Sequence, residues 1–335
     1  MSAHKTLIIG CGSIGERHLR CFQKTGRTEV VACDSNATLT ARMRDTYGVA
    51  IESDWSRAVC SGQFDSVSIC TPAPLHVIMA KSALEAGLHV LVEKPLSHSL
   101  EGIGELLAAR DRAQRQATVA YVFHQIPALK AARAFLRSEP FGPIRQATML
   151  AGQPFHLLRP AYAQTYYRSR ASGGGAIQDA LTHSANWIES VLGPTESVLC
   201  DCAHLVLPDV EVEDTVHVAA RHASGALASY TLNQFQGPNE TSLQFNAARG
   251  SVRIEFHRQR WGHFAVGASD WTWEEAPIEH RDTLFISQAD AFLDMIEGKP
   301  ATVCSLDAAV DTLRFNLAAI ASAERGQRVL CSEVK

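Results

Sequence analysis

Hydrophobic and polar residues follow two different patterns along this chain, and the change comes near residue 122. In the first part, short apolar runs alternate with helical patterns, which is typical of a parallel sheet covered by helices. The runs predicted to be strands are Thr6–Ile9, Val30–Cys33, Asp65–Cys70, His89–Val92 and Ala117–Phe123. Helical patterns are predicted over 13–22, over the segment that ends at Glu85, and over 97–114. We therefore predict a doubly wound α/β domain over residues 1–122.

The second part contains β-like runs joined by short turns, which favour antiparallel pairing. The predicted strands are 144–150, 197–206, 215–221, 226–234, 241–247 and 251–256. Helices are predicted over 128–138, 176–192, 287–297 and 306–325. Residues 123–335 are thus expected to form a second domain that mixes helices with an antiparallel sheet.

Composition narrows the class of protein. The chain has 335 residues, 20% of them charged, and a formal net charge of -4, which is ordinary for a globular protein of about two domains. No apolar stretch approaches the ~20 residues of a membrane span, and the N-terminus lacks a signal-peptide core. We expect a cytoplasmic protein without nucleic-acid or membrane partners.

The nine cysteines are scattered and odd in number, which indicates free thiols in a reducing compartment. Cys200 and Cys202 share one strand face, and His204 is the only further ligand type nearby. A zinc site needs a fourth ligand in register, so we expect no metal.

A glycine-rich motif joins the first predicted strand to the first helix. It runs Gly10-Cys11-Gly12-Ser13-Ile14-Gly15, and Asp34 ends the next strand about 20 positions later. In this context the pattern is that of a dinucleotide-binding turn, in which a pyrophosphate lies at the helix N-terminus. Gly10 makes the tight turn, Gly12 allows close approach to the pyrophosphate, and Gly15 allows the helix to pack on the strand.

Asp34 is predicted to accept hydrogen bonds from the ribose hydroxyls of the adenosine. Its neighbours Ser35 and Asn36 are uncharged, and no arginine or lysine follows immediately to bind a 2′-phosphate. The sequence therefore favours NAD over NADP. A glycine turn that binds no nucleotide is the alternative.

Lys94 lies between Glu93 and Pro95, directly after the strand His89–Val92. Proline restricts the residue before it and permits a cis bond, so Lys94 is held at the strand end with limited freedom. Ligands of α/β sheets bind outside the carboxyl ends of the strands. We predict that Lys94 projects into a binding site.

A second group of polar residues follows Gly173-Gly174-Gly175. Asp179 and His183 are four positions apart in the predicted helix, so the carboxylate can orient the imidazole. An ordinary histidine pKa of about 6.5 suits a general base. The glycines are predicted to allow close approach to the nicotinamide or the substrate. A purely structural hydrogen bond is the alternative for this pair.

These motifs, in this order, resemble those of the Gfo/Idh/MocA family, the glucose-fructose oxidoreductase and inositol dehydrogenase group. The match includes the glycine-rich motif with Asp34, the segment from Thr71-Pro72 to His76, Glu93-Lys94-Pro95, and the triple glycine that leads to Asp179 and His183. The resemblance implies a Rossmann domain and a C-terminal α/β domain with a large open sheet, often used for oligomerisation. It also implies that Lys94, Asp179 and His183 are catalytic and act on sugars, cyclitols or their derivatives.

The chain departs from the family pattern in two places. Asn186 stands where many relatives carry an aspartate, and Phe123-His124-Gln125 stands where many have Asn-Arg. Both positions usually help to bind the substrate, so the substrate cannot be assigned by analogy.

The predicted site residues fall into two groups. For the cofactor they are Gly10, Gly12, Ser13, Ile14, Gly15, Asp34, Ser35, Thr71, Pro72, His76, Glu93 and Lys94, with Glu93 alternatively pairing with a neighbouring cation. For the substrate they are Lys94, His124, Tyr162, Tyr167, Arg168, Asp179 and His183, with half-buried packing as the alternative for the tyrosines. Trp271 and Trp273 are expected to pack on the sheet or at an interface.

The hypothesis that joins these features is an NAD-dependent oxidation of a secondary alcohol, or its reverse, on a sugar or cyclitol. His183 is the base, Lys94 holds the reacting oxygen, and Asp179 orients the imidazole. A redox-neutral enzyme that cleaves glycosides or epimerises, and a non-catalytic NAD/sugar sensor, are the alternatives. A homo-oligomer, either a dimer or a tetramer, is expected.

Overall fold

The computed structural model describes residues 4–334, which divide into two compact units. One comprises 1–125 and Glu279–Ala309, and the other comprises Ile126–Ile278 and Val310–Lys335. The sequence predicted a single boundary after residue 122. The difference is the segment Glu279–Ala309, which returns to the first unit.

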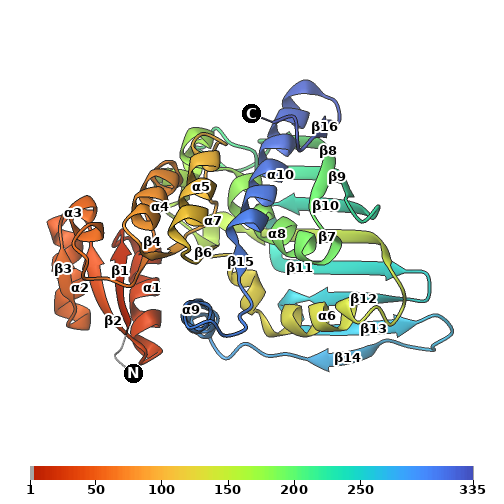
Figure 1. The fold of residues 1–335 in the computed structure, drawn as a ribbon. Coiled ribbons are helices and arrows are strands. Elements are labelled where there is room, and N and C mark those ends of the chain that lie inside the picture. Colours follow the sequence, from red (N-terminus) through yellow and green to blue (C-terminus); the bar gives the residue numbers. More distant parts are fainter. Residues whose placement is uncertain (1–3, 335) are drawn as a thin grey trace. The chain divides into compact units, whose positions relative to one another are not determined.

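The first unit is a seven-stranded sheet in the order β15-β6-β5-β4-β1-β2-β3 (Figure 1). Strands β1 to β6 are parallel, and their order β3-β2-β1-β4-β5-β6 is that of dinucleotide-binding domains. This order confirms the predicted fold class. The strands are β1 His4–Ile9, β2 Thr28–Cys33, β3 Ala50–Glu52, β4 Ser66–Ile69, β5 His89–Val92, β6 Ala117–Val119 and β15 Cys304–Ser305. The helices are α1 Ser13–Lys24, α2 Ala37–Tyr47, α3 Trp55–Val59, α4 His76–Glu85, α5 Ile103–Ala113 and α9 Arg281–Ile296.

Helix α9 belongs to this unit because it packs on α1. Asp282 accepts hydrogen bonds from Arg17 and Arg20, and the ring of Phe285 lies edge-on to His18, 5.6 Å between centroids. Strand β15 then adds an antiparallel edge to β6. Such contacts between distant segments leave no mark in local hydrophobic periodicity, so the sequence analysis placed this helix in the second domain.

The second unit is a nine-stranded sheet in the order β14-β13-β12-β11-β7-β10-β9-β8-β16. All pairs are antiparallel except β7 with β10. The strands are β7 Ile144–Pro154, β8 Thr195–Ala203, β9 Thr215–His222, β10 Leu227–Asn233, β11 Phe235–Ala247, β12 Gly250–Glu255, β13 Arg260–Ala265, β14 Thr272–Glu275 and β16 Val329–Leu330. The helices are α6 Pro127–Arg137, α7 Phe155–Leu158, α8 Thr182–Leu192 and α10 Leu306–Arg325.

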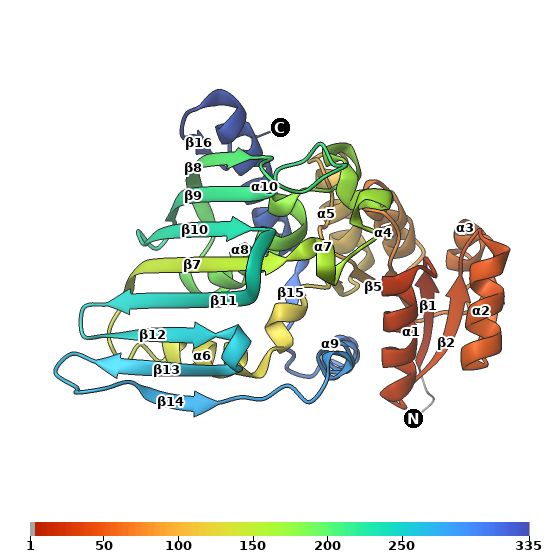
Figure 2. The ribbon, with the colours of Figure 1, turned by 180° about the vertical axis from the view of Figure 1, so that it is seen from behind.

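Helices α6, α8 and α10 lie on one face of this sheet, and Figure 2 shows the other face without such a cover. Burial alternates along the strands, as in β9, where every second residue from Val216 to His222 is buried. The alternation follows from the period of two of a β-strand with one solvated face. The expected large, open and mostly antiparallel sheet is confirmed.

Several predicted bounds change. The helix predicted from residue 97 begins at Ile103, and the one predicted from residue 287 begins at Arg281. The strand Ala117–Phe123 ends at Val119 and a 3₁₀ turn follows. Helix α2 and strands β13 and β14 were not predicted. Trp271 and Trp273 stack on each other at 5.4 Å beside β13.

A buried carboxyl group joins α8 to its surroundings in the second unit. Glu189 accepts hydrogen bonds from the Thr312 hydroxyl at 2.6 Å and from the Thr195 N–H at 3.2 Å. Burial raises the pKa of Glu189 to about 7. The folded chain therefore keeps this proton over a pH range in which the unfolded chain has lost it.

We expect Glu189→Gln to flatten the pH dependence of stability between about pH 4.5 and 7. In the parent protein, the raised pKa of Glu189 adds to the free energy of unfolding below pH ~4.5, and this contribution is lost as the pH rises toward 7. The contribution is on the order of 3 kcal/mol. Glutamine keeps one acceptor and adds a donor without a charge to bury. Urea unfolding at pH 5 and pH 7.5 measures the difference, and parallel pH dependences for the two proteins would contradict the assignment.

Candidate functional site

The glycine-rich motif forms the turn between β1 and α1. A Cβ atom at Gly15 would lie 1.7 Å from the carbonyl oxygen of Gly10, so no other residue fits there. A Cβ atom at Gly12 would meet no protein atom within 4 Å, and Gly12 caps α1 without a side-chain hydrogen bond. This open space lies at the N-terminus of α1, where the first N–H groups of a helix have no partner within the helix, and it agrees with the predicted pyrophosphate position.

Two alanine substitutions should therefore separate folding from cofactor binding. Gly15→Ala forces Gly10 to move and should lower the free energy of unfolding by about 1–3 kcal/mol or more. Gly12→Ala should leave the unfolding curve unchanged and weaken NADH binding, because its methyl group fills the space for the ligand. Chemical denaturation and NADH fluorescence titration measure the two effects. Equal loss of stability in both variants would contradict these roles.

Asp34 lies immediately after β2 and is held against the glycine-rich turn. Its carboxylate accepts hydrogen bonds from the N–H of Cys11 at 2.7 Å and of Asn36 at 2.9 Å. Ser35 beside it is exposed. The carboxylate is thus fixed next to the predicted pyrophosphate position, as binding of the adenosine ribose requires.

Glu93, Lys94 and Pro95 leave β5 with a cis Lys94–Pro95 peptide bond. The buried Glu93 carboxylate lies 2.7 Å from the His18 ring and accepts the Lys94 N–H at 3.0 Å. Burial would raise the pKa of Glu93, but the hydrogen bond from His18 and the charge of Lys94 lower it on balance. The Glu93 carboxylate is thus held by the His18 ring and by the backbone of Lys94, and His18 is a partner that sequence reasoning did not identify.

His76 joins the loops that follow β4 and β5. Its ring nitrogens lie 2.9 Å from the carbonyl oxygen of Pro95 and 2.7 Å from that of Thr71, and burial lowers its pKa. The buried ring is therefore engaged by the backbone beside Pro72 and Lys94. We infer that His76 shapes the predicted cofactor site by fixing these loops, whereas direct contact with the cofactor stays a prediction.

In the second unit, Asp179 and His183 lie on a helix that begins with a π-turn over Ile177–Leu181 and continues as α8. Both side chains are half-buried. Single π-turns inside helices are frequent at functional sites because they shift the direction of the side chains around them. The predicted helix is present, but with this wider first turn.

The triple glycine fits its own chain closely. A Cβ atom at Gly174 would lie 2.3 Å from the carbonyl oxygen of Tyr167, and one at Gly175 would lie 2.5 Å from the Glu213 carboxylate. These neighbours belong to the protein itself, so the approach to the nicotinamide or the substrate stays a prediction. The glycines allow the segment before the helix to pack closely against the backbone of Tyr166 and Tyr167, which places Tyr166 next to the helix.

Glu213 and Arg170 hold the start of this helix. The buried Glu213 carboxylate accepts the Ile177 N–H at 3.0 Å and pairs with Arg170 at 3.0 Å. A carboxylate at a helix N-terminus is favoured by the unpaired N–H groups and the helix dipole. No sequence pattern links Glu213 to a helix that begins so far before it, so sequence reasoning missed this residue.

Tyr166 touches the predicted catalytic pair. Its hydroxyl donates a hydrogen bond of 2.6 Å to the Asp179 carboxylate, although 44% of the residue is exposed. A bond of this length from a hydroxyl to a carboxylate is among the stronger hydrogen bonds. Tyr166 directly precedes Tyr167 and Arg168, two of the residues predicted for the substrate, but was not itself one of the predicted site residues.

The other predicted substrate residues have different surroundings. Tyr162 and Tyr167 are buried, and they form a cluster with Phe155, Leu207, Val210 and Val212. This placement favours the packing alternative for both tyrosines. Arg168 is exposed, and His124 is buried in the first unit.

Asn186, one of the two departures from the family pattern, points into the core. Its side-chain amide donates to the Thr312 hydroxyl at 2.9 Å, and the residue is buried. The Thr312 hydroxyl in turn donates to Glu189. Asn186 is therefore part of the polar network between α8 and α10.

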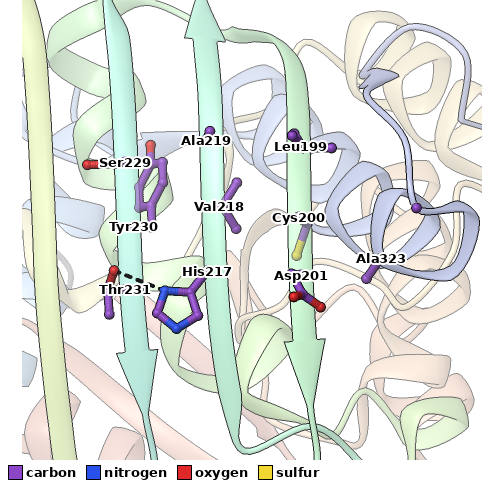
Figure 3. A pocket seen from close by; sticks show the side chains of 11 residues that line it. Leu199, Cys200, Asp201, His217, Val218, Ala219, Ser229, Tyr230, Thr231 and Ala323 are labelled. Atoms are coloured by element: carbon purple, nitrogen blue, oxygen red, sulfur yellow. Dashed lines mark hydrogen bonds between the residues drawn. The ribbon is translucent and has the colours of Figure 1, made fainter.

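A hollow of about 600 Å³ lies on β8, β9 and β10. Figure 3 shows its side chains, including Asp201, His217 and Thr231, the last two joined by a hydrogen bond of 3.4 Å. None of the predicted site residues lines it. The hollow thus has no part in the predicted chemistry.

Within residues 4–334, no three histidine, cysteine or acidic side chains are placed to hold a metal ion. All nine cysteines are free, and the His204 ring contacts the carbonyl oxygen of Leu207. No helix in that range is long and apolar enough to cross a bilayer.

Comparison with known proteins gives two family matches. Residues 4–121 match the oxidoreductase family GFO_IDH_MocA, described as an NAD-binding Rossmann fold, and residues 129–253 match the GFO/IDH/MocA C-terminal domain. Both halves of the predicted resemblance are thereby confirmed.

Curated relatives are distant. Levoglucosan dehydrogenase of Pseudarthrobacter phenanthrenivorans is 24% identical over 75% of this chain and 73% of its own length. For 1,5-anhydro-D-fructose reductase of Ensifer adhaerens the identity is 27%, with 78% of each chain covered. The chain spans about half (52%) of an uncharacterized oxidoreductase from Synechocystis, at 29% identity.

Solved structures share the fold. A levoglucosan dehydrogenase in complex with NADH and levoglucosan superimposes with a TM-score of 0.89 at 19% identity, covering 99% of this chain and 100% of that one. The WlbA dehydrogenase, in complex with NADH and UDP-GlcNAcA, superimposes with a TM-score of 0.81 at 24% identity. The match covers 98% of this chain and 96% of that one.

Proposed function

Because the chain belongs to the Gfo/Idh/MocA oxidoreductase family, we propose that it is an NAD-dependent enzyme that interconverts a secondary alcohol and a ketone on a sugar, cyclitol or sugar derivative. The observation that carries the proposal is the match of both halves of the chain to this family. The catalytic roles are assigned to Lys94, which is half-buried at the end of β5, and to His183, which is half-buried one turn after Asp179.

In the proposed reaction, His183 accepts the proton of the substrate hydroxyl. Lys94 donates a hydrogen bond to the same oxygen and stabilises its alkoxide character. Asp179 orients the imidazole, and Tyr166 holds the Asp179 carboxylate through its 2.6 Å hydrogen bond. NAD, when bound, supplies the hydride acceptor.

The substrate class rests on the relatives. Three enzymes similar to this chain are named after their compounds, which are levoglucosan, D-apiose and 1,5-anhydro-D-fructose. All three compounds are carbohydrates. The residues around Asp179 differ from the family pattern at Asn186. We therefore propose a sugar or sugar derivative as the class and leave the individual compound to experiment.

A screen of thermal stability tests the proposal. The protein is mixed with NAD and then with single sugars, anhydrosugars, cyclitols, uronic acids or nucleotide sugars, because a ligand stabilises its binder by mass action. Compounds that raise the melting temperature are then assayed for NADH at 340 nm. Net NADH formation supports a dehydrogenase.

Two other results would redirect the proposal. A stabilising sugar that is cleaved or epimerised without net NADH indicates the redox-neutral alternative. Stabilisation by a sugar without any turnover indicates a sensor. We further propose a cytoplasmic homo-oligomer, a dimer or tetramer, which size-exclusion chromatography with light scattering tests.

A further inference from the structure

We propose that Arg42 gives the adenosine end of the cofactor site a latent capacity to hold a 2′-phosphate, which the neighbouring carboxylates of Asp34 and Glu16 suppress. The two side chains contact the same residue of the glycine-rich turn. The Cys11 N–H donates to Asp34 at 2.7 Å, and Arg42 donates from Nη2 to the Cys11 carbonyl oxygen at 3.4 Å. A carboxylate and a guanidinium therefore border the place where the ribose is expected.

The local fold explains how Arg42 reaches this place. The Asn36 side chain caps α2 by accepting the N–H groups of Thr38 and Leu39, which fixes where the helix begins after β2. Arg42 then lies on the face of α2 that meets the glycine-rich turn. The sequence prediction considered only the residues directly after Asp34, so it overlooked a cation delivered by the next helix.

The charges around Arg42 explain why the ribose diol should still be preferred. Arg42 pairs with Glu16 at 2.9 Å, and Tyr47 donates to the other Glu16 oxygen at 2.8 Å. Glu16 therefore pairs with the guanidinium, and Asp34 holds a second negative charge at the same glycine-rich turn. A 2′-phosphate would add about 1.5 to 2 negative charges next to Asp34, whereas ribose hydroxyls can donate to it.

Arg42 nevertheless retains the capacity to bind a phosphate. Its side chain is 47% exposed, and a guanidinium has five N–H donors, so it can keep Glu16 and accept another anion. Arginine forks match phosphate oxygens well. Once the Asp34 charge is removed, the Arg42 guanidinium is expected to attract a 2′-phosphate more strongly than the one remaining carboxylate, Glu16, repels it.

The test measures binding of NADH and NADPH to the full chain by fluorescence titration at one ionic strength, because exposed charges are screened by salt. Asp34→Asn should bind NADPH about 10- to 100-fold more tightly than the parent protein. Adding Arg42→Ala should remove most of this gain. The matched control adds Arg44→Ala instead; Arg44 lies on the same helix and bonds to Asp45, so the gain should persist.

With Asp34→Asn, two results overturn the proposal: a gain that survives Arg42→Ala, or the absence of any gain in a protein that still binds NADH. If Asp34→Asn disturbs the turn so that neither nucleotide binds, Glu16→Gln tests the proposal instead. It removes a carboxylate beside Arg42 and leaves the contact between Asp34 and Cys11 intact. It should raise NADPH affinity severalfold only while Arg42 is present. Equal NADPH affinity with and without Glu16→Gln overturns the proposal.

Discussion

Replacing Lys94 by methionine is expected to lower kcat by about 10²- to 10³-fold, the usual cost of removing one donor that stabilises a developing oxyanion. Methionine keeps much of the length and apolar volume of the lysine stem but cannot donate a hydrogen bond. Lys94 is half-buried at the end of β5, and its backbone N–H is fixed by the Glu93 carboxylate. A donor held in this way contributes more to catalysis than a mobile one.

The measurement is the initial rate of NADH formation with the sugar found by the thermal screen, together with the affinity for NADH. Nucleotide affinity should change little, because the proposed role of Lys94 is toward the substrate oxygen. Lys81→Met is the matched control, since Lys81 lies on the surface of α4 and pairs with Glu105. A Lys94→Met enzyme with near-normal kcat would remove Lys94 from the mechanism.

Much of the cofactor half could be predicted because its signals are local. The glycines, the strand before them and Asp34 lie within one short stretch, and steric constraint at Gly15 leaves only glycine possible. The alternation of apolar strands with helices then predicts a parallel sheet, whereas the order of its strands came from the structure. Helix α2 was missed, although its Asn36 cap is a recognisable start signal.

The parts that could not be predicted depend on contacts between distant segments. Glu213 reaches the π-turn, and Phe285 packs on His18, through tertiary structure alone. The same reason explains why the burial of Tyr162 and Tyr167 could not be predicted. Polar residues such as Gln164, Thr165 and Arg168 surround them in the sequence, whereas apolar side chains that bury them come from the separate segment that contains Leu207 and Val212.

Replacing His183 by asparagine should lower kcat by about 10²- to 10⁴-fold, the range for loss of a general base. Asparagine keeps a polar side chain but cannot accept the hydroxyl proton. A merely structural histidine would also lower activity if its loss disturbed α8, so the unfolding transition of the variant is measured alongside the rate. A large loss of kcat with an unchanged transition assigns the effect to chemistry.

Rescue and coupling test the role of His183 more sharply. Added imidazole should restore part of the activity of His183→Asn, because a free base can occupy the vacated space, and should leave Lys94→Met unchanged. Asp179→Asn should cost less than His183→Asn, and in the His183→Asn background it should have little further effect, because Asp179 acts through the imidazole. Additive losses would show that Asp179 and His183 do not act as one unit. Equal rescue of His183→Asn and Lys94→Met would show that imidazole does not replace the His183 ring.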